Sequence, residues 1–252
     1  MHLRSVLFFL VLAANARADW ATVSSESEPG PGGLEHRHVV LENAAGGRRS
    51  TVDLAIFSTK SYTLRVIQND GGDSLAEAMT RETCLAGVNG GYFDENFAPI
   101  GLRIVNGQTT APLKRARLIT GVLFASSRGV QIVRSRDFSR RSGVTAAIQS
   151  GPFLVDLTRP ISGLNDSNVA RRTFAATTTG SRALLGVCSA VSLAELSKIL
   201  ATTSFAEDLK IERALNLDGG SSTGFWFARE NGGALSIREY KPVRDFVGVV
   251  PK

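Results

Sequence analysis

Hydrophobic and polar residues alternate along most of the chain, and this period of two is typical of β-strands with one buried face. A helical spacing of apolar residues occurs in residues 74–82 and in the segment that begins at Ser192, where Ser192 and Glu195 form a capping-box pattern. The pattern predicts one α+β domain whose mixed, largely antiparallel β-sheets are flanked by a few helices. The predicted strands are residues 39–41, 52–57, 62–67, 84–88, 102–105, 118–124, 130–133, 144–148, 174–178, 183–187, 213–217, 225–227, 234–237 and 246–250.

The first 36 residues lack this alternation. Residues 1–18 combine Arg4, an apolar run and an Ala-Arg-Ala end, which predicts a cleaved signal peptide and a periplasmic or secreted protein. The apolar run is shorter than the roughly 20 residues that a membrane anchor needs, and no membrane span is expected after signal removal. Residues 19–36 are rich in Ser, Glu, Pro and Gly, so we expect a flexible lead-in there and the folded domain in residues 37–252.

The chain is basic, with 29 Lys and Arg against 23 Asp and Glu and a net charge of +6. The basic residues are densest in two segments, residues 114–117 and 134–141. The favoured interpretation is a solvated basic surface, and attraction to phosphorylated or acidic glycans is the second one. No nucleic-acid partner is expected.

The two cysteines, Cys84 and Cys188, raise the question of a disulfide. An even number of cysteines in an exported protein favours a bridge. Both residues lie in apolar runs, so two buried free thiols are the alternative. Zinc is not expected, because no histidine lies near either thiol in the sequence.

Three predicted strands end in polar residues followed by glycine. In Asn216-Leu217-Asp218-Gly219-Gly220 the two polar side chains are two residues apart, so a strand would present them on one face. The other two segments are residues 89–94, Asn-Gly-Gly-Tyr-Phe-Asp, and residues 149–152, Gln-Ser-Gly-Pro. Asn-Gly is also a strong hairpin signal, so a plain turn is the alternative at residue 89.

These three segments, together with Arg172-Thr173 before a strand, resemble in sequence and order the phosphodiester glycosidase domain family. That family includes the "uncovering enzyme", N-acetylglucosamine-1-phosphodiester α-N-acetylglucosaminidase, and many bacterial proteins. The similarity extends from about residue 39 to residue 250. The chain departs from the family near its C-terminus, where Lys241 stands before Pro-Val in place of the usual arginine. Lysine lacks the bidentate fork that arginine offers to a phosphate.

The resemblance implies an exported glycosidase that hydrolyses a sugar-1-phosphodiester on a glycan or cell-envelope polymer, releasing the sugar and leaving a phosphomonoester. Such chemistry normally uses two carboxyl groups. We expect Asp218 and Asp94 as this pair, with Arg172 holding the phosphate. The role of each aspartate, as nucleophile or as base, stays open. The expected substrate-binding residues are Asn89, Gly90, Gly91, Gln149, Ser150, Gly151, Thr173, Asn216, Gly219, Gly220 and Ser221.

The sequence raises three other interpretations. Residues 220–224 fit the G-x-S-x-G pattern of serine hydrolases, but no histidine follows Ser222 in the chain, so a serine esterase is not expected. No cofactor is certain, and an oxygen-ligated Ca²⁺ or Mg²⁺ near Asp218 stays open as a metal site. The alternative function is a non-catalytic periplasmic or cell-surface glycan-binding module that uses the same side chains without turnover.

Overall fold

The structure, a computed structural model, describes residues 19–139, 143–206 and 209–252 of the 252-residue chain. These residues form three β-sheets, one of eight strands and two of five, and two α-helices. Each strand pair between the described residues is antiparallel. The expected single domain of antiparallel sheets is confirmed, but the sheets are not mixed and the fold is richer in β-structure than an α+β class implies.

The eight-stranded sheet is covered on one side by helix α2 (Leu193–Thr202), which begins at Ser192 with the predicted capping box. Leu196, Ile199 and Leu200 of this helix pack against apolar side chains of the sheet. In sheet order the strands are β1 (Trp20–Pro29), β2 (Glu35–Asn43), β3 (Arg49–Ser58), β14 (Arg182–Val191), β13 (Ala170–Thr178), β15 (Ile211–Asn216), β11 (Phe153–Asp156) and β12 (Arg159–Pro160).

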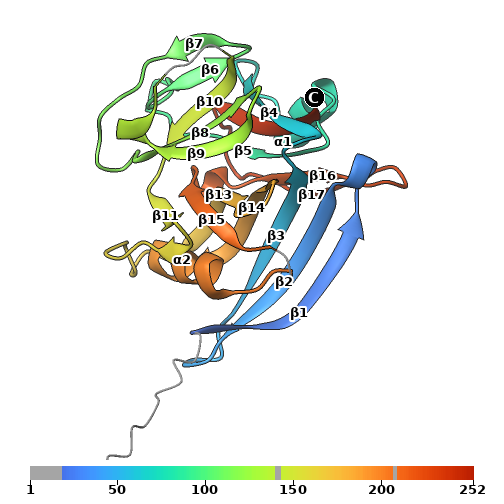
Figure 1. Cartoon of the computed structure of the whole chain (residues 1–252), viewed down its shortest axis with the longest axis vertical. Helices are drawn as coiled ribbons and strands as arrows, with labels where there is room; N and C mark the ends of the chain where they lie inside the picture. The colour runs from blue at the N-terminus through green and yellow to red at the C-terminus, as the bar shows by residue number, and fades with distance from the viewer. Residues whose placement is uncertain (1–18, 140–142, 207–208) are drawn as a thin grey trace, which may run out of the picture.

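The two five-stranded sheets lie above the eight-stranded one in the view of Figure 1. Helix α1 (Leu75–Arg81) packs against the second of them through Leu75 and Met79. The first contains β7 (Gln108–Ala111), β6 (Arg103–Val105), β10 (Val144–Ser150), β8 (Gly121–Ser126) and β9 (Gly129–Arg134). The second contains β17 (Ala234–Ile237), β16 (Phe225–Ala228), β5 (Ala86–Asn89), β18 (Asp245–Pro251) and β4 (Tyr62–Gln68).

One apolar cluster joins all three sheets. Phe57 and Leu215 come from the eight-stranded sheet, Leu123 and Ile148 from the β8 sheet, and Val88 from the β5 sheet. All five side chains are at most 2% exposed. Burial of such side chains stabilises the fold by about 1.5–3 kcal/mol each, so this shared core fixes the three sheets against one another.

The predicted flexible lead-in of residues 19–36 is wrong, because β1 pairs with β2 along its whole length. Trp20 anchors the strand with a side chain only 3% exposed, and the guanidinium of Arg48 lies 5.2 Å from its ring centroid. The next seven residues are exposed. A strand whose side chains nearly all face water has no alternation to detect, so the sequence pattern missed it.

The predicted signal peptide, residues 1–18, lies outside the described residues. Within the described ranges, neither helix is long and apolar enough to cross a membrane.

The two cysteines do not form the expected disulfide; both are free and buried. Cys84 packs beside α1 with Ile67 and Met79. Cys188 lies in the cluster under α2, with its sulfur 3.4 Å from the hydroxyl oxygen of Ser50. The thiols thus belong to different clusters on different sheets, and the alternative of two buried thiols is confirmed.

A buried ion pair connects two sheets. Nη1 of Arg103 in β6 lies 3.4 Å from Oδ2 of Asp245 in β18, and the two side chains are 4% and 2% exposed. Burial raises the pKa of Asp245 to about 6. Burial also lowers the pKa of Arg103. A pair of this kind is costly to separate, because the remaining charge would be buried without a partner.

Neither thiol is expected to react in the folded protein. Burial raises the pKa of Cys84 to about 11 and that of Cys188 to about 12. At pH 8 a thiol of pKa 11 is roughly one-thousandth thiolate, the reactive form. Mass spectrometry after maleimide treatment should show no labelling of the native protein and two labels after denaturation without reductant. Rapid native labelling, or recovery of a linked Cys84–Cys188 peptide, would contradict this result.

The carboxyl group of Asp245 should make stability fall as pH rises through a defined window. Its pKa is about 6 when folded, whereas an unfolded carboxyl titrates near pH 4. The folded state therefore holds the extra proton between these values, and the free energy of unfolding decreases by up to about 1.4 kcal/mol per pH unit there.

Asp245→Asn keeps an oxygen acceptor but cannot titrate, so this contribution should disappear. The measurement is urea unfolding of both proteins at steps from about pH 4 to 6. Because all other titrations are shared, the difference between the two curves isolates residue 245. Parallel curves would contradict the assignment.

Candidate functional site

Asn89, the last residue of β5, joins three distant segments of the chain. Its Oδ1 accepts hydrogen bonds from the hydroxyl of Thr173 at 2.6 Å and from the N–H of Gly224 at 3.1 Å. Its Nδ2 donates to the carbonyl of Asp218 at 2.8 Å. The expected substrate-binding groups of Asn89 and Thr173 are therefore bonded to each other and to the chain around Asp218, and both residues position the site.

The double glycine after Asn89 lies against Asp245. The N–H of Gly90 donates to the carbonyl of Asp245, and the N–H of Gly91 donates to its Oδ1, each at 2.9 Å. A Cβ on Gly90 would lie 2.1 Å from that Oδ1, so only glycine fits. Both N–H groups of these expected substrate-binding residues thus already have acceptors within the protein. The carbonyl of Gly90 instead accepts the N–H of Asp218 at 3.1 Å.

Asp218 lies two residues beyond the end of β15. The N–H of Leu217 donates to the carbonyl of Thr173 at 2.8 Å, so the backbone of the Asp218 segment runs beside β13, the strand that holds Arg172. The carboxylate of Asp218 accepts the N–H of Gly219 at 2.8 Å and the hydroxyl of Ser222. Burial raises the pKa of Asp218, while these two hydrogen bonds lower it. Ser222 was not among the expected site residues.

Arg172 is a buried cation that is held by carbonyl oxygens. Its side chain donates from Nε to Val191 at 3.1 Å and from Nη2 to Asn168. Burial lowers its pKa, but an arginine stays charged in a protein. No carboxylate of the described residues forms an ion pair with it. A buried charge without a counter-charge favours a bound anion.

Gly219 allows the Asp218 loop to lie against Arg172. A Cβ at residue 219 would be 3.0 Å from the carbonyl oxygen of Arg171 and 3.9 Å from Cδ of Arg172. Gly220 adopts a φ of +65°, which glycine favours. Gly220 and Ser221 are half-buried, and the Ser221 carbonyl accepts the N–H of Tyr240.

Tyr92 connects two of the expected segments and was itself missed. Its hydroxyl donates to the carbonyl of Gly151 at 2.7 Å and accepts Nδ2 of Asn216 at 2.8 Å. Burial and the nearby charge of Asp218 raise the pKa of Tyr92 to about 12, while Arg172 acts in the opposite direction. Tyr92 therefore lies within the electrostatic reach of both charged residues and stays a neutral phenol at neutral pH.

Two buried acceptors near this phenol have no hydrogen-bond partner among the described residues: Oδ1 of Asn216 and Oγ of Ser150. The three side-chain contacts of Asn216 all come from Nδ2, to Tyr92, Gly151 and its neighbour Leu217. Asn216 and Gly151 thus belong to one hydrogen-bond network, and both are buried.

Two of the expected residues are not joined to this group. Asp94 is exposed, and its Oδ1 accepts the N–H groups of Asn96 and Ala98 in its own loop. Gln149 is 1% exposed, and its amide bonds the backbone of Leu102, Lys114 and Ile119. A sugar hydroxyl would have to displace these bonds, so the structure gives Gln149 the role of a connector.

Lys241, the residue that departs from the family pattern, is exposed in the segment between β17 and β18. Its neighbour Tyr240 is 76% exposed, and the guanidinium of Arg171 lies 4.6 Å from the centroid of its ring.

The donor set around Asp218 does not match a Ca²⁺ site. Ca²⁺ takes six to eight oxygen ligands, usually with several carboxylates. Within the described part of the chain, no three His, Cys, Asp or Glu side chains are grouped to hold a metal ion. No step of the chemistry is therefore assigned to a metal.

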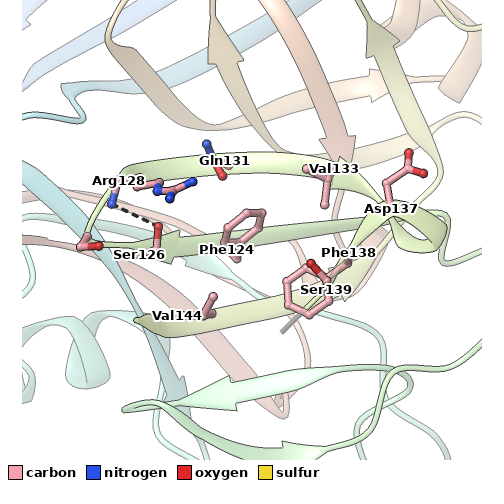
Figure 2. Close-up of a pocket in the computed structure, with 10 residues that line it drawn as sticks. Phe124, Ser126, Arg128, Gln131, Val133, Asp137, Phe138, Ser139 and Val144 are labelled. Carbon is pink, nitrogen blue, oxygen red and sulfur yellow. Dashed lines mark hydrogen bonds between the residues drawn. The ribbon is translucent and has the colours of Figure 1, made fainter. Parts of the chain in front are cut away.

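A separate cavity has a volume of about 660 Å³, and Figure 2 shows the residues that line it. It is lined by Phe124, Val133, Asp137, Phe138 and Val144, around the β8–β9 hairpin, together with Ser126, Ser127, Arg128, Gln131 and Ser139. None of the expected site residues lines it. A cavity of this size is not by itself evidence for the reaction centre, since the charged groups lie elsewhere.

Known structures share the fold. The catalytic domain of zebrafish N-acetylglucosamine-1-phosphodiester α-N-acetylglucosaminidase, auto-inhibited by its pro-peptide, matches with a TM-score of 0.66 and 14% identity, covering 92% of this chain and 89% of that one. A hypothetical protein from Synechocystis matches with a TM-score of 0.61 and 16% identity, covering 87% and 62%. A putative exported protein from Burkholderia pseudomallei K96243 gives 0.52 and 13%, covering 82% and 75%.

Sequence comparison adds the family. The uncharacterized protein YigE of Escherichia coli K12 is 34% identical over 89 residues, which are 32% of this chain and 35% of that protein, so the match spans about a third of its length. The family model of the phosphodiester glycosidases matches residues 82–250, which include Asn89, Arg172 and Asp218. This match covers well over half of the sequence and confirms the resemblance carried by the four motifs: the chain belongs to the phosphodiester glycosidase family.

Proposed function

We propose that this protein hydrolyses the glycosidic bond of a sugar-1-phosphodiester, on a glycan or cell-envelope polymer, and leaves a phosphomonoester. The observation that supports the proposal is the position of two oppositely charged groups on adjoining segments. Among the described residues, the buried guanidinium of Arg172 bonds only to carbonyl oxygens, and Asp218 lies on the segment beside its strand. Membership of the phosphodiester glycosidase family supports the same reaction class.

Arg172 binds the phosphate in this proposal. A guanidinium donates several N–H groups in a fixed plane, which suits phosphate oxygens. Its bonds to Val191 and Asn168 hold that plane in place before substrate arrives. As the bond between C1 and the phosphate oxygen breaks, the electron pair goes to that oxygen. A fixed cation there stabilises the departing phosphomonoester.

Asp218 stabilises the positive charge that develops on the sugar. Glycosidic cleavage passes through an oxocarbenium-like state, which a nearby carboxylate favours. The Gly219 N–H and the Ser222 hydroxyl hold this carboxylate in one orientation. Water then supplies the hydroxyl group at C1. A phosphomonoester leaves readily, so the mechanism needs less acid assistance than ordinary glycoside hydrolysis does.

The alternative, a glycan-binding module without turnover, would use the same Arg172 but would not require the charge of Asp218. The kinetic effect of neutralising this carboxylate therefore separates the two functions.

Asp218→Asn should lower kcat by about 10²–10³, the usual cost of losing one electrostatic partner of the transition state. The amide keeps the shape and the Oδ1 acceptor for Gly219. Asp94→Asn is the matched comparison, because Asn also retains the acceptor that caps the loop, and its kcat should change little. Both are measured on one soluble sugar-1-phosphodiester. Normal kcat in Asp218→Asn would refute the role of this carboxylate, and an equal loss in Asp94→Asn would restore the two-carboxylate mechanism.

Arg172→Lys should mainly raise KM, by roughly 10- to 100-fold, because hydrogen bonds to a charged group contribute about 1.5–3 kcal/mol. Lysine keeps the charge but not the planar fork. Inorganic phosphate should inhibit the wild type more strongly than this variant. Unchanged KM together with unchanged phosphate inhibition would exclude Arg172 as the phosphate ligand.

Ser222→Ala should shift the pH profile without abolishing activity. The Ser222 hydroxyl stabilises the ionised carboxylate and so lowers the pKa of Asp218 against the effect of burial. Its removal raises that pKa, so less carboxylate is ionised at low pH and the acidic limb of kcat/KM should move to higher pH. A folded but inactive Ser222→Ala protein at every pH would instead favour a serine nucleophile.

We also propose that the protein is exported to the periplasm or beyond. Arg4, the apolar run and Ala-Arg-Ala before Asp19 support a cleaved signal. N-terminal sequencing of the protein from a periplasmic or secreted fraction should begin at or near Asp19. Full-length protein in the cytoplasm would contradict export.

A further inference from the structure

The two basic segments of the sequence meet at one cavity of about 620 Å³, outside the site described above. Lys114 and Arg115 come from the loop between β7 and β8. Arg134 and Arg136 come from the end of β9 and the turn that follows it. The rest of the lining is mostly apolar and consists of Leu113, Ala116, Ile119, Thr120, Ser135 and Phe138.

Most of this positive charge is not neutralised by the protein. Lys114 and Arg115 are exposed and have no acidic partner among the described residues. Arg136 has only the exposed Asp137, at 3.7 Å. Arg134 is the exception, since it donates to a carboxylate oxygen of Asp156 at 2.8 and 3.0 Å. Three cations therefore face the cavity with little compensation, which attracts an anion of more than one charge.

The cavity is mechanically connected to the candidate site. The Gln149 amide binds the N–H and the carbonyl of Lys114, which fixes the backbone of the basic loop. Gly151 is two residues beyond Gln149 in the chain. A Cβ on Gly151 would lie 2.3 Å from the carbonyl oxygen of Leu118, so the loop between β7 and β8 packs directly on residue 151. On its carbonyl side the same residue accepts bonds from Tyr92 and Asn216. The cavity and the site thus lie on either side of one chain segment.

We propose that this cavity is an additional binding site for phosphate groups of a polyanionic chain, so that the protein recognises a polymer with repeated phosphates. The identity of this chain as the substrate polymer rests on the proposed function; the binding of a polyphosphate does not. The apolar lining suits the carbon-rich units between the phosphates. Such a site adds affinity for a long ligand without touching the reacting bond.

The first test uses inorganic polyphosphate as the probe. Tripolyphosphate and a longer inorganic polyphosphate are titrated into the full mature protein by calorimetry at several salt concentrations. Wild type should bind the longer chain more tightly, with an affinity that falls steeply with salt because counterions are released. The Lys114→Ala/Arg115→Ala variant should bind it at least tenfold more weakly. The slope of log K against log salt concentration should also be smaller in magnitude by about 1.4. This value is the loss of two phosphate contacts at about 0.7 each, as for single-stranded nucleic acids.

The matched control is Lys60→Ala/Arg128→Ala, which removes the same number and type of charges. Lys60 and Arg128 are exposed, and Arg128 lies in the turn of the β8–β9 hairpin, at the opposite end from Arg134. This variant should bind polyphosphate like wild type. An equal loss of affinity in both variants would mean that only net charge acts, and would overturn the proposal.

Turnover separates this inference from the proposed function. On a soluble substrate with one phosphodiester, Lys114→Ala/Arg115→Ala should have wild-type kcat and KM, within about twofold. Absence of turnover in wild type would refute the proposed function and leave the titration result standing. Absence of polyphosphate binding by wild type would refute the cavity site and leave the kinetics standing.

Anionic lipid vesicles provide the remaining comparison, because Leu113 and Leu118 of the same loop are 41% and 74% exposed. Vesicles containing phosphatidylglycerol are tested by co-sedimentation with wild type and both double variants. Vesicle binding that depends on Lys114 and Arg115, with no binding of polyphosphate, would assign the loop to a membrane surface and overturn the proposal. Binding of polyphosphate in the calorimetric titration, which contains no vesicles, supports the proposal.

Discussion

The side-chain amide of Asn89 is the interaction on which the arrangement of the site depends. At this residue the five-stranded sheet that contains β5 is bonded to the eight-stranded sheet, through Thr173, and to the loop after β15, through Asp218 and Gly224. One donor and one acceptor group thereby hold two segments that are each more than 80 residues from Asn89 in the sequence. At 1% exposure these bonds do not compete with water. Because such a buried network is costly to satisfy only in part, the site is either assembled as a whole or not at all.

Most of the polar groups that resemble ligands in the sequence are used to build the site. Gly90 and Gly91 donate to Asp245, and Gln149 carries the basic loop. These groups of the family motifs therefore bond within the protein, whereas Oδ1 of Asn216 and Oγ of Ser150 have no partner among the described residues. The charged groups that can still act on a substrate are the guanidinium of Arg172 and the carboxylate of Asp218. In these motifs, most polar groups therefore support the site rather than face a ligand.

The sequence predicted the elements that have a strong period and missed those that do not. Helix α2 with its capping box and most strands of the core were found, because each follows from local pattern. The core strand β11 was missed, because it is only four residues long and shows no alternation. Strand β1 was missed because its exposed side chains show no alternation. The predicted disulfide was wrong because an even number of cysteines does not indicate where in the fold each thiol packs. Ordered motifs located Arg172 and Asp218, but the contacts of Tyr92 and Asp245 are made only in three dimensions and had no local signal.

The contact between Gly90 and Asp245 has a consequence for how this sequence can change over time. The carboxylate occupies the space that any side chain at residue 90 would need, and it also provides the acceptor for the next N–H along the chain. A side chain at residue 90 fits only after Asp245 has been replaced by a smaller residue. That replacement leaves the buried guanidinium of Arg103 without its ion-pair partner and the Gly91 N–H without its acceptor. A single substitution at residue 90 or at residue 245 is therefore unfavourable while the other residue is unchanged. Divergence in this part of the fold must proceed through paired changes, so residues 90, 103 and 245 should evolve as one unit even where the surrounding surface varies freely.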